Sequence, residues 1–371
     1  MKNQKNAEKK KNSYTPLIFA AVVALLFTVT MLVYFKVNIA ADKIMTDESG
    51  IDYTKEYAFI TKDSSDDFWS PVYDQMKSYG DENGIYIQWM GKNITGDYSW
   101  AELMEIAREA DVDGIIVEAD DSEESHYGIN KAVYSGIPVV TVRTDSQLSK
   151  RISYVGVSYY NLGTEYGNLI LSCAGDVLKK TYEEEESTEK TEDEKAEKEA
   201  LVKVMVLMDK DTSDTSQNTI LLAIQEQLNK NEELSDLIEV TPLLIDNSSD
   251  FSAEESVQDL LKDPNPADII ICLNEINTVS VYQAIVEQNK VGDTIIIGYS
   301  DNDTVLNAIE KNIVYATITA DVDQLGKSCI EALMEYSEYG RVSDYYSVNF
   351  TVINNSNVKQ FVKKEVTDEA Q

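Results

Sequence analysis

Residues 114–142, GIIVEADDSEESHYGINKAVYSGIPVVTV, contain the repeating unit that decides the fold. An apolar run at 114–117 is followed by an amphipathic segment at 124–134 and by a second apolar run at 137–142. A strand without polar alternation is buried on both faces, which is typical of a parallel sheet covered by helices. This stretch therefore predicts a strand–helix–strand unit with parallel strands.

The same alternation continues over most of the chain and forms two series. In the first series we predict strands at 57–61, 85–90, 114–117, 137–142 and 154–157, and helices at 71–79, 101–110, 124–134 and 162–179. In the second series we predict strands at 202–208, 238–245, 268–273, 294–298 and 315–319, and helices at 219–228, 253–261, 278–288 and 303–310. Each series corresponds to one doubly wound, Rossmann-like α/β lobe. The length of 371 residues accommodates two lobes of about 100–150 residues each.

Composition and charge exclude several classes of function. With 43% hydrophobic and 26% charged residues, the chain has the composition of a globular protein. Acidic residues outnumber basic ones 66 to 32, and the net charge of −34 repels phosphate backbones, so we expect no nucleic-acid binding. The chain contains one histidine, His126, and three cysteines, Cys173, Cys272 and Cys329. These counts argue against His-rich zinc sites, disulfide frameworks and a Cys–His catalytic pair, so we expect neither a metal nor a cofactor.

The N-terminal segment predicts a membrane anchor. A lysine-rich tail, residues 1–15, precedes the uncharged run LIFAAVVALLFTVTMLVYF at 17–35, which as a helix spans roughly the 30 Å of a bilayer core. Lysines before the run and acids after it favour a cytoplasmic N-terminus. We therefore expect a cytoplasmic tail at 1–15, a transmembrane helix at 16–36, a polar tether at 37–54 and an extracytoplasmic remainder. A cleaved signal peptide is the alternative, because residues 39–41 (IAA) resemble a small-residue cleavage site.

Residues 181–200, TYEEEESTEKTEDEKAEKEA, break the alternation. Apart from Tyr182 they contain no large apolar residue, so they cannot bury a stripe against a core. We interpret this acidic stretch as a surface insertion between a helix and the next strand. Cation binding and docking to a partner are the alternatives.

A ligand site is expected at the carboxyl ends of the strands, because open parallel sheets bind ligands in the crevice beyond those ends. The segments there are 61–69, 118–121, 143–145, 209–214, 246–251, 274–275, 299–302 and 320–321. They contain no Gly-rich phosphate loop and no Ser–His–Asp set. Carboxylates occur throughout the chain, and no pair stands out for acid–base catalysis. The sequence therefore predicts a pocket that binds without catalysing a reaction.

Several segments, taken in order, resemble the ribose/galactose-type solute-binding proteins. These segments are AFITKDSSDDFWSPVYDQMKSYGDENGIYIQ (58–88), DVDGIIVEADDSEESHYGINKAVYSGIPVVTV (111–142), YVGVSYYNLGTEYGNLI (154–170), DIIICLNEINTVSVYQAI (268–285), TIIIGYSDNDTVLNAIEKNIVYATITADVDQLGKSCIEAL (294–333) and YYSVNFTV (345–352). The resemblance covers about residues 55–355. It implies two lobes that are joined by three crossing strands and close on a ligand by hinge motion.

The resemblance also implies how the chain is divided. It places the crossings near 158–160, 320–321 and 348–350. The first lobe then comprises residues 55–158 and 321–347. The second comprises 159–320 and 348–362, with the acidic insertion at 181–200, and residues 363–371 form a tail.

Candidate ligand contacts follow from the resemblance and from the strand ends. Family sugar sites place an aromatic pair after the first strand to stack on the sugar ring, and Phe68 and Trp69 occupy that place. Asn274 fits an expected Asn before the helix of the 268–285 segment. Arg143 offers a forked donor to pairs of oxygens. The further candidates are acidic residues at strand ends: Asp66, Asp120 and Asp301.

Each of the main candidates also has a structural interpretation. The aromatic pair can be a hydrophobic contact at the start of the first helix, and Asn274 can be a plain helix N-cap. Arg143 can form a bridge within its lobe to Asp145 or Asp120.

The pocket pattern departs from the family at several positions. Arg143-Thr144 stands where an Asp-Arg pair is expected. Elsewhere, Thr219 replaces an expected Arg, Ser300 an expected Asp and Ala320 an expected Gln. Groups that bind vicinal hydroxyls in pairs are therefore missing, and the resemblance implies the fold more strongly than the ligand.

We expect a membrane-anchored solute-binding protein that captures a small ligand, a sugar or polyol, and delivers it to an ABC permease. The alternative is a sensor subunit that passes its closed state to a membrane histidine kinase or chemoreceptor. The predicted cytoplasmic tail is too short to signal by itself, so that role requires a partner. An enzyme on the same scaffold is disfavoured by the missing catalytic residues.

Overall fold

The structure is a computed structural model that describes residues 18–19, 22–31, 45–46, 51–66, 68–92, 96, 98–187, 202–210, 216–262 and 266–362. Within these residues no helix is both long and apolar enough to cross a membrane. Residues 18–19 and 22–31 of the predicted anchor are helical, and the rest of that segment lies outside the described residues. The predicted tails at 1–15 and 363–371 lie outside them as well.

The first lobe is built on a six-stranded parallel sheet in the described part of the chain. Its strands are β3 (Lys55–Ile60), β4 (Ile85–Met90), β5 (Gly114–Val117), β6 (Val139–Val142), β7 (Ser153–Val157) and β13 (Tyr345–Val348), in the order β13-β7-β6-β5-β3-β4. Its helices are α3 (Trp69–Glu82), α4 (Trp100–Glu109), α5 (Glu123–Tyr134) and α11 (Val322–Tyr339). A short pair, β1 (Met45–Thr46) and β2 (Asp52–Tyr53), precedes the sheet.

The second lobe repeats this plan within the described residues. Its strands are β8 (Val202–Asp209), β9 (Ile238–Ile245), β10 (Ile269–Cys272), β11 (Ile295–Tyr299), β12 (Ala316–Ala320) and β14 (Phe350–Asn354), in the order β14-β12-β11-β10-β8-β9. Its helices are α6 (Tyr159–Ser187), α7 (Ser216–Asn229), α8 (Asp250–Leu260), α9 (Glu275–Glu287) and α10 (Asp303–Glu310), with short 3-10 turns at Ser235–Leu237 and Val358–Gln360. All pairings are parallel except that of β14 with β12.

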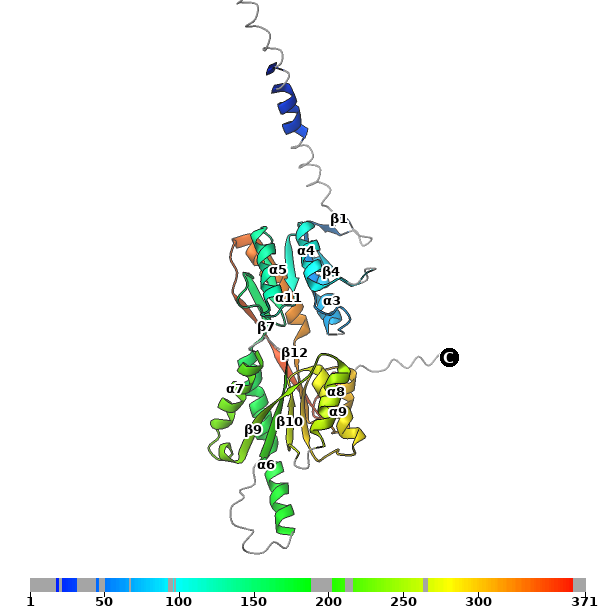
Figure 1. Ribbon diagram of the computed structural model, residues 1–371, viewed down its shortest axis with the longest axis vertical. Coiled ribbons are helices and arrows are strands. Elements are labelled where there is room, and N and C mark those ends of the chain that lie inside the picture. The colour runs from blue at the N-terminus through cyan, green and yellow to red at the C-terminus, as the bar shows by residue number, and fades with distance from the viewer. Residues whose placement is uncertain are drawn as a thin grey trace, which may run out of the picture.

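The described chain passes between the lobes three times (Figure 1). It leaves the first sheet after β7 to enter α6, returns from β12 to α11, and leaves again between β13 and β14. The last two passages are joined by hydrogen bonds: the amide of Asp321 donates to the carbonyl of Asn349 (2.9 Å), and the amide of Asn349 donates to Oε1 of Gln324 (2.8 Å). The predicted α/β architecture of two doubly wound lobes is confirmed.

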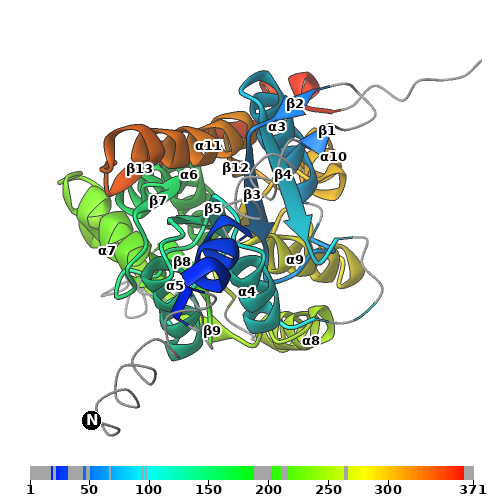
Figure 2. The ribbon, with the colours of Figure 1, turned by 90° about the horizontal axis from the view of Figure 1, so that it is seen from above.

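Each sheet is covered on both faces. In the first lobe, α3 and α11 lie on one side of the strands and α4 and α5 on the other (Figure 2). Strands β5, β6 and β10 are buried along their whole length, as their apolar sequences require. One hydrophobic cluster continues through the lobe junction, where Val157, Leu162 and Leu325 belong to it. The lobes therefore share part of one core.

Most element boundaries differ from the prediction by one to three residues, and two of the differences bear on the site and on the acidic stretch. Helix α3 begins at Trp69, two residues before the predicted start, with Phe68 at its N-cap position. Helix α6 continues to Ser187, so the first part of the acidic stretch extends the helix into solvent. Residues 188–200 of that stretch lie outside the described residues.

Close packing of α3 against α11 generates a prediction about stability. A Cβ added at Gly326 in α11 would lie 2.7 Å from the carbonyl oxygen of Val72 in α3, so Gly326→Ala must push the two helices apart. We expect it to lower the free energy of unfolding by about 1–3 kcal/mol. Gly175 in α6 has nothing within 4 Å of its added Cβ, and Gly175→Ala should instead raise the free energy of unfolding by about 0.5–1 kcal/mol. Urea unfolding of both variants measures these free energies. Equal changes in the free energy of unfolding for the two variants would contradict the tight contact between α3 and α11.

Candidate ligand-binding site

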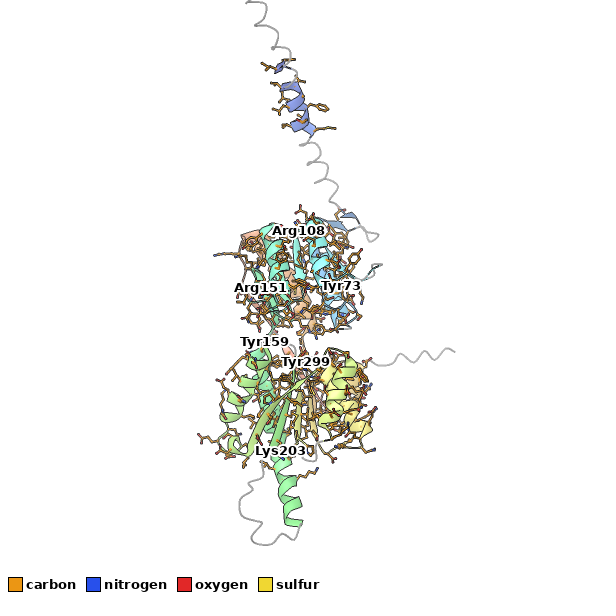
Figure 3. The ribbon with its side chains drawn as sticks, viewed as in Figure 1. Tyr73, Arg108, Arg151, Tyr159, Lys203 and Tyr299 are labelled. Carbon is orange, nitrogen blue, oxygen red and sulfur yellow. The ribbon has the colours of Figure 1, made fainter. Side chains whose placement is uncertain are left out.

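A cavity of about 240 Å³ lies between the lobes, where the carboxyl ends of the two sets of strands face one another. Its lining comes from both lobes: Phe68, Arg143, Thr144, Gly156, Val157, Tyr159, Leu162, Asp209, Ser216, Gln217, Ile220, Leu273, Asn274, Tyr299, Ala320 and Leu325. Pockets for drug-sized ligands usually measure about 300–1,000 Å³, so this cavity suits a smaller molecule. Figure 3 shows Tyr159 and Tyr299 at the junction of the lobes.

Arg143 is the cation of this cavity. One of its guanidinium nitrogens donates to Oδ2 of Asp66 at 2.9 Å and lies 3.8 Å from Oε1 of Glu118. The guanidinium is also 4.3 Å from the ring centroid of Phe68, a cation–π distance. Burial acts to lower the pKa of Arg143, but Glu118, Tyr299 and Asp66 raise it overall. The side chain therefore keeps its charge, and the nearby carboxylates counter that charge.

The expected bridge from Arg143 to Asp145 or Asp120 is wrong. Asp145 is held by Arg151, whose Nη2 donates to it at 2.7 Å, and Asp120 forms an ion pair with Lys62. Asp145 follows β6 and Asp120 follows β5, and each acid pairs with a basic residue of its own lobe. Arg143 therefore stays directed at the cavity lining.

The backbone of Arg143 is held in a conformation that few L-residues adopt. Its φ is 67°, in the left-handed region, which costs an ordinary residue about 1–3 kcal/mol. Its carbonyl accepts hydrogen bonds from the hydroxyls of Tyr154 at 2.9 Å and Tyr159 at 3.1 Å. Burial raises the pKa of Tyr154 well above its usual value, so the phenol stays protonated as a donor. Because Tyr159 is the first residue of α6, this contact ties Arg143 to the first crossing.

The two aromatic residues after β3 face different surroundings. Phe68 is half-buried and lines the cavity. Trp69 is fully buried, packs edge-on against Phe59 with ring centroids 5.4 Å apart, and has no hydrogen-bond partner for its indole N–H among the described residues. Neighbouring positions at a helix start point in different directions, so the two rings cannot share one face. Of the two residues, Phe68 lines the cavity and Trp69 lies in the core, and stacking of either ring on a ligand stays a prediction.

Asn274 caps a helix and also lies in the lining of the cavity. Its Oδ1 accepts a hydrogen bond of 2.8 Å from the amide of Asn277, which caps the N-terminus of α9. The residue is half-buried and lines the cavity. The cap uses only the oxygen, so the amide nitrogen remains a donor for a ligand.

The three acidic candidates, Asp66, Asp120 and Asp301, differ in how close they lie to the cavity. Asp66 reaches the site only through Arg143, since its other carboxylate oxygen accepts from the amide of Phe68 at 2.9 Å. Asp120 does not line the cavity; burial acts to raise its pKa, but hydrogen bonds from Lys62, Ser122 and Ser125 lower it overall, which marks a structural carboxylate. Asp301 is exposed and does not line the cavity either. Asp120 and Asp301 therefore lie outside the lining of this cavity, and their contact with a ligand stays a prediction.

Other lining residues were not singled out from the sequence. The strand-end rule included the segments of Asp209, Tyr299 and Ala320 without giving them a role. Leu162, Ile220 and Leu325 belong to the first turns of α6, α7 and α11, which the strand-end rule does not cover. For Leu162 and Leu325 the signal that could have identified them is the first turn of a helix that follows a crossing, and for Ile220 it is the start of the helix after β8.

Metal and thiol chemistry find no support in the described part of the chain. No cluster of three or more His, Cys, Asp and Glu side chains there could hold a metal ion. All three cysteines are buried, and burial raises the pKa of Cys173 to about 12. A thiol with so high a pKa is protonated at neutral pH and is a poor nucleophile.

The different positions of the two aromatic residues predict opposite effects of truncation. Trp69→Ala leaves a large void in the core of the first lobe and should lower the free energy of unfolding by about 3–5 kcal/mol. Phe68→Ala removes a half-buried ring and should cost clearly less stability. Thermal or urea unfolding of the two variants tests this; a Trp69→Ala protein as stable as the parent would show that the ring is not part of the core.

Comparisons with known proteins agree with this architecture. The family model described as periplasmic binding protein domain matches residues 57–341. No curated protein sequence matches the chain. Among solved structures, the chain is similar to a glucose-galactose binding protein from Geobacillus stearothermophilus, with 18% identity and a TM-score of 0.66 over 82% of this chain and 98% of that one.

Two further structures are similar over comparable lengths. An arabinose binding protein from Geobacillus stearothermophilus has 16% identity and a TM-score of 0.66 over 83% of this chain and 99% of that one. A chain of the XylFII-LytSN complex has 19% identity and a TM-score of 0.64 over 81% of this chain and 98% of that one. At such identities the likeness establishes the fold. Because the family model spans both lobes, this protein belongs to the periplasmic binding protein domain family and is a ligand-binding protein, not an enzyme.

Proposed function

We propose that this protein captures a small neutral sugar or polyol between its lobes, outside the cell membrane, and delivers it to an ABC importer. The observation that carries the proposal is the cavity between the lobes, where Phe68 and Arg143 of one lobe face Asn274 of the other. An aromatic ring suits the apolar face of a sugar, and the arginine and the amide supply donors for its hydroxyls. The sugar ligands named for two similar structures support the same class.

The charges at the cavity favour a neutral ligand. Arg143 already pairs with Asp66 and lies near Glu118, so an anionic ligand would have to compete with two carboxylates for one cation. Burial raises the pKa of Glu118, whereas the nearby Arg143 acts to lower it. A sugar hydroxyl can accept from the guanidinium without displacing either carboxylate.

Contacts from both lobes explain how binding would be coupled to closure. A ligand that touches Arg143 and Asn274 together binds the closed arrangement more tightly than an open one, and so shifts the population toward it. Closure buries the ligand and excludes water from its hydrogen bonds. An importer that recognises only the closed arrangement would then accept only loaded protein.

A binding screen with two variants of Asn274 tests the proposal. Hexoses, pentoses and polyols should include at least one that raises the melting temperature, since a ligand at a hundredfold excess over Kd adds about 2.7 kcal/mol of stability. Asn274→Ser keeps the cap on Asn277 and should lose affinity with little loss of stability. Asn274→Ala should lose affinity and about 1 kcal/mol of stability as well. A screen in which no carbohydrate shifts the melting temperature would contradict the proposal.

A sensor function is the second candidate. One similar structure is a chain of the two-protein complex XylFII-LytSN, which shows that this fold occurs in an assembly with a second protein. For the present chain we propose a membrane histidine kinase or chemoreceptor as the partner in that case. Cross-linking in intact cells distinguishes the two functions: an importer permease captured in the presence of ligand supports transport, and a kinase or receptor supports sensing.

The location outside the membrane rests on the sequence of residues 1–36 and has its own test. We expect protease added to intact protoplasts to digest the two lobes, and we expect the protein to stay with the membrane fraction after a high-salt wash. Soluble protein that begins near residue 42 would show cleavage and would remove the anchor from the proposal.

A further inference from the structure

A second cavity, of about 300 Å³, lies within the second lobe and shares no lining residue with the cavity between the lobes. We propose that it is a second binding site, which takes one neutral sugar unit, either free or part of a longer glycan. Its lining consists of Gly292, Thr294, Ile295, Asn312, Ile313, Val314, Tyr315, Asn354, Asn355 and Ser356. This site goes beyond the function proposed above, which concerns the inter-lobe cavity.

The second cavity lies at the far end of the sheet from the first lobe. Its segments at 292–295 and 312–315 lead into β11 and β12, and 354–356 end β14, which runs antiparallel to β12. These are the amino ends of β11 and β12, whereas the carboxyl ends face the first lobe. A sugar unit bound here contacts the second lobe alone, so it has no preference between open and closed arrangements.

The lining of the second cavity is uncharged. Among the described residues that form it, none carries a charge, although 26% of the chain is charged and the net charge is −34. The ammonium of Lys180 in α6 donates to the carbonyl of Gly292 at 3.5 Å, but Lys180 does not belong to the lining. A charged ligand group would lose water without gaining a lining partner of opposite charge, which is unfavourable. The lining therefore suits a neutral ligand.

Three asparagine amides supply the polar groups. Nδ2 of Asn355 donates to the carbonyl of Ile309 at 3.3 Å and to Oδ1 of Asn312 at 2.7 Å. Oδ1 of Asn354 accepts from the amide of Ser356 at 2.9 Å. These backbone partners decide which end of each side-chain amide is oxygen and which is nitrogen. Within the described chain they leave three atoms without a partner: Nδ2 of Asn312, Nδ2 of Asn354 and Oδ1 of Asn355.

Two donors and one acceptor of this kind match the hydroxyls of a sugar, because each hydroxyl can both donate and accept. Tyr315 adds an aromatic ring that is 41% exposed. Its hydroxyl forms a hydrogen bond of 3.1 Å with Oγ of Ser172 in α6, which holds the ring in place. Such a ring suits the C–H face of a sugar. Amides, a fixed ring and the absence of charge in the lining together favour a neutral sugar unit over an ion.

A pair of glycine variants tests the site. Asn312 has φ of 55°, which glycine adopts without strain, so Asn312→Gly removes one amide of the lining and should preserve the fold. Asn289→Gly is the matched control, since Asn289 has φ of 54° in the same lobe and does not line the cavity. We measure binding of D-glucose, D-galactose and cellotetraose to the full chain by saturation-transfer NMR. Both variants are made in the Asn274→Ser protein, in which the inter-lobe cavity is weakened.

We expect Asn312→Gly to weaken binding about 5-fold, the effect of one lost hydrogen bond, and Asn289→Gly to leave it unchanged. Binding that Asn312→Gly does not change would overturn the second site, while a loss caused by Asn274→Ser would still support the inter-lobe cavity. Binding that responds to Asn312→Gly but not to Asn274→Ser would support the second site and contradict the inter-lobe function. Absence of binding by every saccharide would overturn both.

Two comparisons of ligands test the class and its source. D-glucuronate differs from D-glucose by one carboxylate, and we expect it to bind the second site about 10-fold more weakly, because the lining offers that charge no partner. Equal or tighter binding of D-glucuronate would overturn the neutral class. Cellotetraose that binds at least as tightly as D-glucose supports a glycan as the ligand, and binding confined to the monosaccharides supports a free sugar.

Discussion

When helices cover both faces of a parallel sheet, side chains from many strands can meet only beyond the carboxyl ends of the strands. Both lobes place these ends at the junction between them. Phe68 follows β3, Arg143 follows β6 and Asn274 follows β10, although these residues are far apart in the chain. The cavity exists because the two sets of strand ends face each other and because the chain returns across the junction. Changes to the strands would therefore disturb the site indirectly, while changes at the strand ends alter it directly.

The fold was predictable because each buried strand must be apolar along its whole length and each helix amphipathic. β4, β9 and α10 have the bounds that the sequence predicts, and the second lobe repeats the pattern of the first. The site was less predictable because it depends on the direction in which each side chain points. Helix α3 begins at Trp69, so that ring turns into the core while Phe68 stays outside, and only the start of the helix decides between them. The ion pair of Asp120 with Lys62 could not be predicted, because Lys62 lies on another loop of the same lobe.

The two lobes share an unusual backbone feature at equivalent places. Arg143 follows β6 with φ of 67°, and Ser300 follows β11 with φ of 104°. In each case the amide donates to the neighbouring strand, to Val155 in one lobe and to Ile318 in the other, both at 3.0 Å. The same turn thus ends the corresponding strand of both sheets, but it carries a cation at the cavity in one lobe and a serine bound to Glu275 in the other. Only the first of these two turns places its side chain in the cavity lining.

The hydrogen bond from Tyr159 to the carbonyl of Arg143 has a consequence for kinetics. Tyr159 starts the first helix of one lobe and Arg143 ends a strand of the other, so a hinge rotation that separates them must break this bond. A hydrogen bond with a net value of about 0.5–1.5 kcal/mol, lost on the way to the open state, slows opening by about 2- to 10-fold. The tyrosine hydroxyl would then lengthen the residence time of a bound molecule through the backbone of Arg143, although Tyr159 also belongs to the cavity lining. The dwell time in this protein can therefore depend on bonds between the lobes as well as on bonds to the ligand.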